Sequence, residues 1–140
     1  MMNRVSITNR KVYPVQSWPA EILDYKLTFF GPAGMACAEP EKGASFHGVI
    51  HKVREEEMKV LDKIEAVYDR IPSKARLYDG TIMDCTVYGD PNSKIDHSND
   101  KPPHERYIHI MTEGAEQHDV DPEYIEHLKN MEMQPRKPID

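Results

Sequence analysis

Residues 73–88 constrain the fold most strongly, because they predict an antiparallel hairpin. The runs 73–78 and 81–88 are strand-like, and the Asp79-Gly80 pair between them is typical of a tight hairpin turn. Apolar and polar side chains alternate along the second run, as expected for a strand with one buried and one polar face. The chain is therefore expected to contain an antiparallel sheet with a core on one side.

Other segments indicate where the remaining strands and loops lie. Three runs predict further strands, at 24–30, 48–53 and 107–112. Glycine and proline interrupt any regular period in residues 31–48, and a polar, proline-bearing sequence does so in residues 89–106. The second of these segments is expected to be a long loop, of a length that is often functional or disordered in small domains.

The length of the chain favours a single folded unit. A chain of 140 residues can bury a substantial core, and this sequence contains no internal repeat. We expect one mixed α/β (α+β) domain over residues 1–133. The proline and charge of residues 134–140 predict a flexible tail.

Composition and charge argue against several kinds of partner. The net charge is −6 and the 18 lysines and arginines form no basic stripe, so no nucleic acid is expected. No segment approaches the roughly 20 apolar residues of a membrane span and no signal peptide is evident, so we expect no membrane partner and a cytoplasmic location. Cys37 and Cys85 lack metal-ligand spacing and are expected to be buried free thiols. The 7 histidines form no metal-binding pattern, and no metal is predicted.

The last helix is the plainer of the two that the sequence predicts. Asp121 is a favourable N-cap, and Pro122 suits the first helical position. An apolar stripe follows, made of Tyr124, Ile125, Leu128 and Met131. This helix is expected to pack against the core and to carry no chemistry.

The other predicted helix, around residues 58–68, contains an acid where the period asks for an apolar residue. Stepping about 100° per residue places Glu65 between Met58 and Leu61 on the apolar face. A carboxylate kept from water titrates at a higher pH, which suits a general acid or base in an internal cavity. From periodicity alone, Glu65 could equally lie at the helix edge, reach solvent, or pair with a nearby arginine or lysine.

The sequence around Glu65 resembles the core of the gamma-glutamyl cyclotransferase-like family. That family's pattern runs G-V, then a helix with L-D-x-x-E, then Y-x-R, and the matching residues here are Gly48, Val49, Leu61, Asp62, Glu65, Tyr68 and Arg70. The segments 17–31, 38–49 and 103–129 resemble further family segments in the same order. The resemblance thus extends over nearly the whole chain.

The resemblance implies a small β-barrel-like mixed sheet with flanking helices, and an enzyme in which Glu65 is the catalytic general acid/base. In the family reaction, the free amine of a γ-glutamyl group attacks its own side-chain carbonyl, so that 5-oxoproline forms and an amine leaves. One carboxylate can take up the first proton and return it to the leaving nitrogen. The implied partner is a small γ-glutamyl or amide substrate, and no cofactor is implied.

The resemblance also gives expected roles to three further residues. Tyr107 matches a family tyrosine near the substrate, where its hydroxyl would orient or donate, or it is simply a packing residue. Tyr68 and Arg70 are the other expected substrate-binding residues, with structural pairing of Arg70 to a carboxylate as the alternative. Asp62 is either a second carboxylate beside Glu65 or an exposed helix residue.

One family feature has no counterpart in this sequence. Family members begin with a strand ending in Y-G-S-N, whose loop holds the substrate, whereas this sequence opens with MMNRVSITNR. A truncated start, a relative that has lost activity, and a strand supplied by another chain are the competing explanations. If the start is genuine, an exposed sheet edge follows and a homo-oligomer is expected.

The alternatives to a cyclotransferase are an inactive small-molecule binding or interaction protein and a proton-transfer isomerase or cyclase on the same fold.

Overall fold

The computed structural model describes residues 2–135, which form one sheet and four helices. The sheet has the order β2-β1-β3-β4, with β1 at Gln16–Phe30, β2 at Met35–Lys52, β3 at Asp69–Leu77 and β4 at Ile82–Gly89. The helices are α1 (Arg4–Asn9), α2 (Glu55–Ile64), α3 (Glu105–Gln117) and α4 (Pro122–Lys129). All the strand pairings described are antiparallel, whereas the resemblance implied a mixed sheet.

The predicted hairpin is present as β3 and β4. Gly80 has a φ of 93°, a conformation that the turn requires and that glycine adopts at little cost. The Asp79 carboxylate accepts a hydrogen bond from the Thr81 N–H at 2.9 Å, which fixes the turn. The predicted strands at 24–30 and 48–53 correspond to the C-terminal parts of β1 and β2.

Strand β2 corrects the prediction that residues 31–48 interrupt regular structure. Apart from a short turn after β1, this segment belongs to β2. A register shift in the pairing of β1 with β2 accommodates the glycine and proline of this segment. Leu23 of β1 pairs with Ser45, whereas Tyr25 pairs with Pro40. Pairing with β1 therefore outweighs the local turn signals.

Helix α3 corrects the predicted strand at residues 107–112. The buried residues of α3 are Ile108, Thr112, Gly114 and Ala115, which follow helical spacing rather than strand alternation. The β-branched residues of the run resemble a strand locally, but tertiary packing of one helical face decides the conformation. The predicted last helix is confirmed as α4, with the Asp121 side chain accepting a hydrogen bond from the Glu123 N–H.

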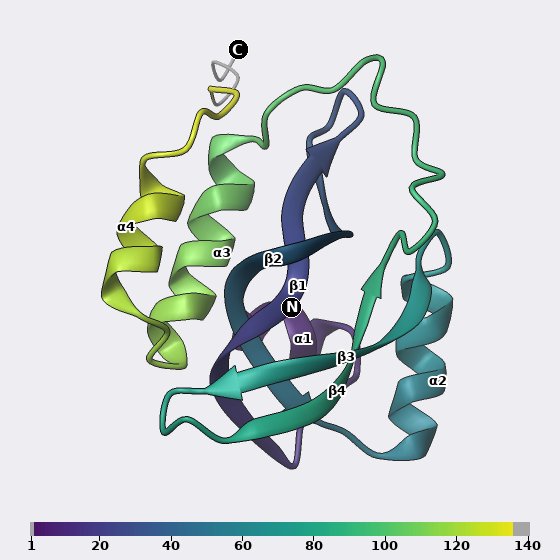
Figure 1. The fold of residues 1–140 in the computed structure, drawn as a ribbon, viewed down its shortest axis with the longest axis vertical. Helices are drawn as coiled ribbons and strands as arrows, with labels where there is room; N and C mark the ends of the chain where they lie inside the picture. The colour runs from purple at the N-terminus through teal and green to yellow at the C-terminus, as the bar shows by residue number, and fades with distance from the viewer. Residues whose placement is uncertain (1, 136–140) are drawn as a thin grey trace.

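The sheet curls until its two edge strands approach each other, which gives the barrel-like shape (Figure 1). At the closure the Asp90 N–H, just after β4, donates to the Ala38 carbonyl of β2 at 3.0 Å. A Cβ atom on Gly89 would lie 2.4 Å from the same carbonyl oxygen, so the closure requires glycine there. The core inside the curl is made of strand residues: Ala20, Ile22, Phe46, Ile50, Ala75, Leu77, Cys85 and Val87.

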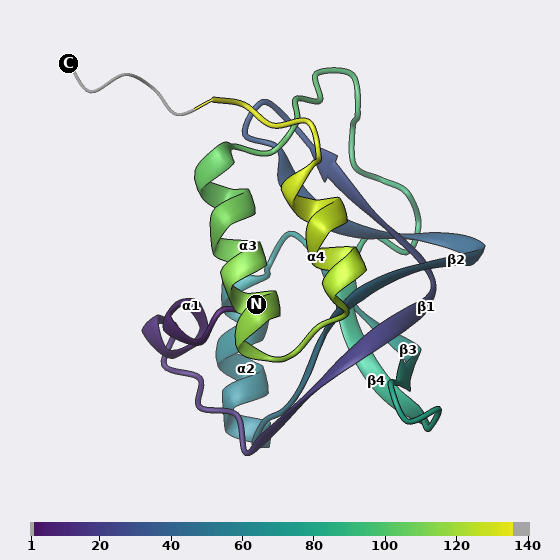
Figure 2. The same cartoon turned by 90° about the vertical axis from the view of Figure 1, so that its left-hand side faces the viewer.

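The helices pack in two groups outside the sheet (Figures 1 and 2). Helices α3 and α4 lie side by side, and Val49 of β2 packs against their buried residues Ala115 and Ile125. Helices α1 and α2 meet through Ile7 and Leu61. This arrangement brings α1 between α2 and α3, a position that matters for the site described below.

The long loop between β4 and α3 is held against the rest of the fold. His97 contacts Glu39 of β2 through Nε2 at 2.5 Å and Asp100 through Nδ1 at 2.6 Å. The Gly31 carbonyl accepts from the Lys101 N–H at 3.0 Å. Together these bonds anchor the loop to β2 and to the turn between β1 and β2.

The segment after α4 is also attached. Gln134, in the predicted tail, donates through its side chain to the carbonyls of Pro32 and Pro102 at 3.0 and 2.8 Å. Its main chain pairs with Pro103 and Glu105. The rest of the predicted tail, residues 136–140, lies outside the described residues.

Candidate functional site

Glu65 lies at the C-terminal end of α2 rather than within a longer helix. Helix α2 ends at Ile64, and the N–H of Glu65 donates to the Leu61 carbonyl at 2.8 Å. The Tyr68 N–H donates to the Glu65 carbonyl at 2.9 Å, so the chain turns here into β3. The predicted helix over 58–68 therefore extends about one turn beyond the end of α2, which begins earlier, at Glu55, and Glu65 is half-buried at the turn.

Tyr68 and Tyr107 meet at the backbone of Ala36, on the free edge of β2. The Tyr68 hydroxyl donates to the Ala36 carbonyl at 2.7 Å. A backbone hydrogen bond from Ala36 also reaches Tyr107 of α3. Each tyrosine ring also packs edge-to-face on a phenylalanine of β1. The ring centroids of Phe29 and Tyr107 are 6.5 Å apart, and those of Phe30 and Tyr68 are 6.3 Å apart. The backbone of one residue thus brings together side chains that are far apart in the sequence.

The charge of Glu65 acts on both tyrosines. Burial is the main cause that raises the pKa of Tyr68 and of Tyr107, and the nearby Glu65 carboxylate raises both further. Tyr107 is 37% exposed as a residue, and burial is still the largest cause of its raised pKa. Both phenols therefore keep their protons at neutral pH, and the structure brings Glu65, Tyr68 and Tyr107 into one cluster.

Arg10 is a member of this cluster that the sequence did not indicate. Its positive charge lowers the pKa of Tyr107. The guanidinium donates to the Ser6 carbonyl at 2.9 Å, and no ion pair joins it to any carboxylate of the described residues. A half-buried arginine without a counter-charge is suited to bind an anionic group of a ligand.

Arg10 directly follows helix α1, which is fixed to α3 by Asn3. The Asn3 side chain donates to the Ile110 carbonyl at 3.3 Å, while its oxygen caps the N-terminus of α1. A Cβ on Gly114 would lie 2.4 Å from the Asn3 backbone nitrogen, so α1 docks only because α3 has glycine at that point. Tyr107 and Ile110 are three residues apart and thus lie on the same side of α3.

Arg70 lies outside the cluster and forms a structural pair. Its guanidinium donates to both carboxylate oxygens of Asp62, at 2.7 and 2.5 Å. The Tyr88 hydroxyl donates to Asp62 as well, at 2.6 Å. These bonds, that of Arg70 first, lower the pKa of Asp62, so it stays ionised beside its partner. This is the pairing alternative considered for Arg70, and Asp62 is occupied by it.

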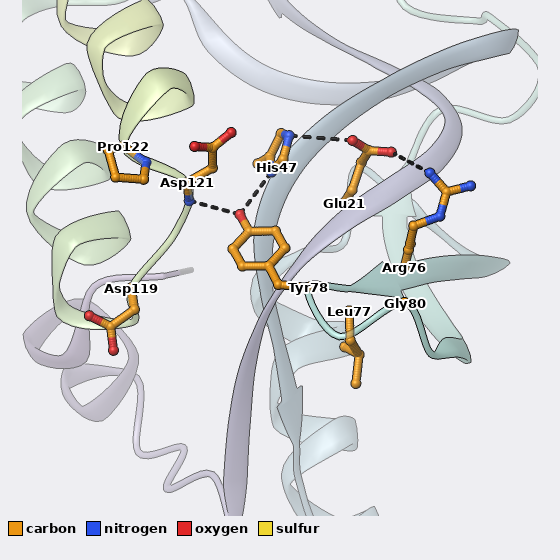
Figure 3. A pocket seen from close by; sticks show the side chains of 9 residues that line it. All are labelled: Glu21, His47, Arg76, Leu77, Tyr78, Gly80, Asp119, Asp121 and Pro122. Atoms are coloured by element: carbon orange, nitrogen blue, oxygen red, sulfur yellow. Dashed lines mark hydrogen bonds and ion pairs between the residues drawn. The ribbon is translucent and has the colours of Figure 1, made fainter.

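A separate pocket of about 450 Å³ opens beside the N-terminus of α4 (Figure 3). It is lined by Glu21, His47, Arg76, Leu77, Tyr78, Gly80, Asp119, Asp121 and Pro122, and by none of the Glu65 cluster. The strand register sets His47 of β2 and Arg76 of β3 on either side of Glu21 in β1. Sequence reasoning missed this row, because only the pairing of three strands creates it.

The described residues offer no group of three histidine, cysteine, aspartate or glutamate side chains arranged to hold a metal. Burial first, and the charges of Glu39 and Asp90 next, raise the pKa of Cys37 to about 11, so this thiol is protonated and unreactive at neutral pH. Both cysteines are free. Within residues 2–135, no helix is long and apolar enough to span a bilayer.

The family follows from a direct match. Residues 45–128 match the model of the AIG2-like family. The chain belongs to the AIG2-like family. Among curated proteins, none shows a significant match to the sequence.

Solved structures confirm the gamma-glutamyl cyclotransferase-like fold that the sequence resemblance implied. A protein named gamma-glutamyl cyclotransferase superposes with a TM-score of 0.78 at 23% identity, covering 95% of this chain and 83% of that one. An uncharacterized human protein gives 0.79 at 24% identity, with 99% and 86% covered. The YkqA protein of Bacillus subtilis gives 0.71 at 18% identity over 95% of this chain and 52% of its own. At these identities the superpositions establish the mixed α+β fold.

Proposed function

We propose that this AIG2-like protein is a gamma-glutamyl cyclotransferase-like enzyme that acts on a small γ-glutamyl or amide substrate and releases 5-oxoproline. The observation that carries the proposal is the half-buried Glu65 carboxylate beside the hydroxyls of Tyr68 and Tyr107. A titratable group set among protonated phenols, at the end of a helix, is the kind of cluster that acid/base catalysis needs. Family membership and the shared fold support the same reaction class.

Glu65 has two proton transfers to perform in this reaction. It first takes a proton from the substrate's ammonium group, and the freed amine attacks the side-chain carbonyl to close a five-membered ring. The bond to the leaving amine then breaks as Glu65 returns the proton to that nitrogen, and the ring nitrogen loses its second proton to the solvent, which leaves the single N–H of 5-oxoproline. Because nucleophile and electrophile belong to one molecule, the protein mainly has to hold the folded conformer and stabilise the carbonyl oxygen as it becomes negative.

The two tyrosines have different parts in the proposal. The proton of Tyr68 is used in its bond to the Ala36 carbonyl, so Tyr68 is a positioning residue. The Tyr107 hydroxyl accepts from the Ala36 backbone, which leaves its own proton available. Tyr107 is therefore the proposed donor to the substrate's carbonyl oxygen.

Arg10 is the proposed anchor for a substrate carboxylate. A γ-glutamyl group carries an α-carboxylate next to its reacting amine, and the Arg10 guanidinium, which has no ion-pair partner among the described residues, is near enough for its charge to lower the pKa of Tyr107. We expect Arg10→Gln to raise KM by about tenfold or more, the loss of one charge-assisted hydrogen bond, with a smaller change in kcat. Steady-state kinetics with a γ-glutamyl amine would measure this, and an unchanged KM would remove Arg10 from the site.

The proposal is tested by 5-oxoproline release, followed by mass spectrometry, from a panel of γ-glutamyl amines and glutathione. Glu65→Gln keeps the size of the side chain but removes the base, and should lower turnover by roughly 10²-fold or more. Glu56→Gln is the matched control, because Glu56 is an exposed acid in α2, the helix that ends just before Glu65. No release by the unaltered protein on any substrate, or equal rates for Glu65→Gln and the control, would contradict the proposal.

A further inference from the structure

The pocket beside α4 contains a chain of hydrogen-bonding groups that the Glu65 reaction does not use (Figure 3). The Tyr78 hydroxyl lies 2.8 Å from His47 Nδ1. On the other side of the ring, His47 Nε2 lies 3.4 Å from a carboxylate oxygen of Glu21. A hydroxyl, an imidazole and a carboxylate are thus aligned in series, the order found when a base activates a nucleophile and an acid orients the base.

The hydrogen-bond partners in the series Tyr78–His47–Glu21 determine which atom carries each proton. A carboxylate only accepts, so the imidazole proton belongs on His47 Nε2, facing Glu21, and the lone pair of Nδ1 faces Tyr78. The Tyr78 oxygen accepts from the Asp121 N–H at 2.8 Å, which leaves its own proton for His47. His47 is therefore placed to receive the phenolic proton.

Neighbouring residues fix the positions of Glu21 and His47 in this series. Arg76 Nη1 contacts the other carboxylate oxygen of Glu21 at 3.2 Å, so both Glu21 oxygens are positioned. The Tyr124 ring of α4 lies on the His47 ring, with centroids 4.8 Å apart. The side chains of His47 and Glu21 are 18% and 26% exposed, whereas Tyr78 is 46% exposed and open to the pocket. The base is thus sheltered from solvent, and Tyr78 lines the pocket.

We propose that Tyr78 is a nucleophile for compact acyl or sulfonyl electrophiles, with His47 as its base and Glu21 as the residue that positions the base. The phenolic oxygen forms a bond to the acyl carbon or the sulfonyl sulfur, and the leaving group departs with its electron pair. The phenolic proton passes to His47 Nδ1, and Glu21 stabilises the resulting imidazolium. The pocket, at about 450 Å³, has room for such a group.

The environment of Tyr78 explains why a base is needed. Burial, with smaller contributions from the carboxylates of Asp121 and Glu21, raises the pKa of Tyr78, and the hydrogen bond from the Asp121 backbone offsets this only in part. The phenol is therefore protonated at neutral pH and reacts only if its proton is removed during the attack. The reaction needs no cofactor, and it does not depend on Glu65.

Labelling with phenylmethanesulfonyl fluoride tests the proposal. The product is a tyrosine sulfonate with release of fluoride, and peptide mass spectrometry gives the rate at each tyrosine. Tyr13 is the internal control, because it is 54% exposed and its hydroxyl has no described partner. Tyr78 should be labelled about 10²-fold faster than Tyr13 or more, the low end of a general-base effect. Equal or slower labelling of Tyr78 would overturn the proposal.

Two further measurements separate the base from the fold. His47→Gln should reduce labelling of Tyr78 to the level of Tyr13 without changing Tyr13, and Glu21→Gln should give an intermediate rate. Nitrogen-15 NMR of the unaltered protein should find the His47 proton on Nε2, and a proton on Nδ1 alone would overturn the proposal even if the variants unfold. Glu65→Gln should leave the labelling of Tyr78 unchanged, so this result is independent of the cyclotransferase activity.

Discussion

Gly89→Ala tests the closure of the curled sheet. The new methyl carbon would lie 2.4 Å from the Ala38 carbonyl oxygen, 3.1 Å from the Ala38 Cβ and 3.1 Å from Ile71 Cδ1. The nearest contact is backbone, so no side-chain rotation can relieve it, and the two edge strands must separate. The hydrogen bond from Asp90 to Ala38, 3.0 Å long, would lengthen at the same time.

The expected magnitude combines two opposing effects. Overpacking in a closed site costs about 1–3 kcal/mol. Replacing glycine by alanine, at a position without a positive φ, returns roughly 0.4–1 kcal/mol by restricting the unfolded chain. The net loss in the free energy of unfolding should be about 1–2 kcal/mol, or roughly 3–6 °C in Tm for a chain of this size.

Urea unfolding followed by circular dichroism would measure this loss, with Gly48→Ala as the matched control. Gly48 lies in β2, and an added Cβ there meets nothing within 4 Å, so its replacement should stabilise the protein by about 0.4–1 kcal/mol. If Gly89→Ala is as stable as the unaltered protein while the control gains as expected, the edge strands are not in contact at this point and the reasoning is refuted.

Two other substitutions have expected outcomes. The hydrogen bond to Asp100, and next that to Glu39, raises the pKa of His97. The protonated ring therefore stabilises the native state most below about pH 6.5. This stabilisation is lost as the pH rises through the raised pKa. The deficit of His97→Gln in urea unfolding should therefore shrink from pH 6 to pH 9, and a constant deficit would argue against the charged bonds. Gly114→Ala should destabilise the protein by about 1–2 kcal/mol through its clash with Asn3, whereas a gain of about 1 kcal/mol, normal for a helical glycine, would show that α1 does not dock there.

Local signals in the sequence were enough to predict two parts of the fold. Asp79 and Gly80 mark the hairpin turn, and Asp121 with Pro122 marks the start of α4, because each signal depends only on neighbouring residues. The run at 107–112 was misleading for the same reason, since its local composition favours a strand and only burial of one helical face selects α3.

The candidate site could be predicted in part. Helical periodicity singled out Glu65, and resemblance added its role together with Tyr68 and Tyr107. The end of α2 at Ile64, which sets the position of Glu65, depends on the turn into β3. Arg10 could not be predicted, because its place beside Tyr107 results from the docking of α1 on α3. Long-range strand pairing likewise determines the pocket at Tyr78 and leaves no local pattern.

The role of Ala36 has a consequence for how this site tolerates mutation. Its contribution is its main chain, whose carbonyl accepts from the Tyr68 hydroxyl and whose backbone also hydrogen-bonds Tyr107. Nearly any amino acid supplies the same main chain, so saturation mutagenesis should find position 36 permissive except for proline, which lacks the N–H. This part of the candidate site would then vary in sequence while its geometry stays constant, and a search for invariant residues would not find it.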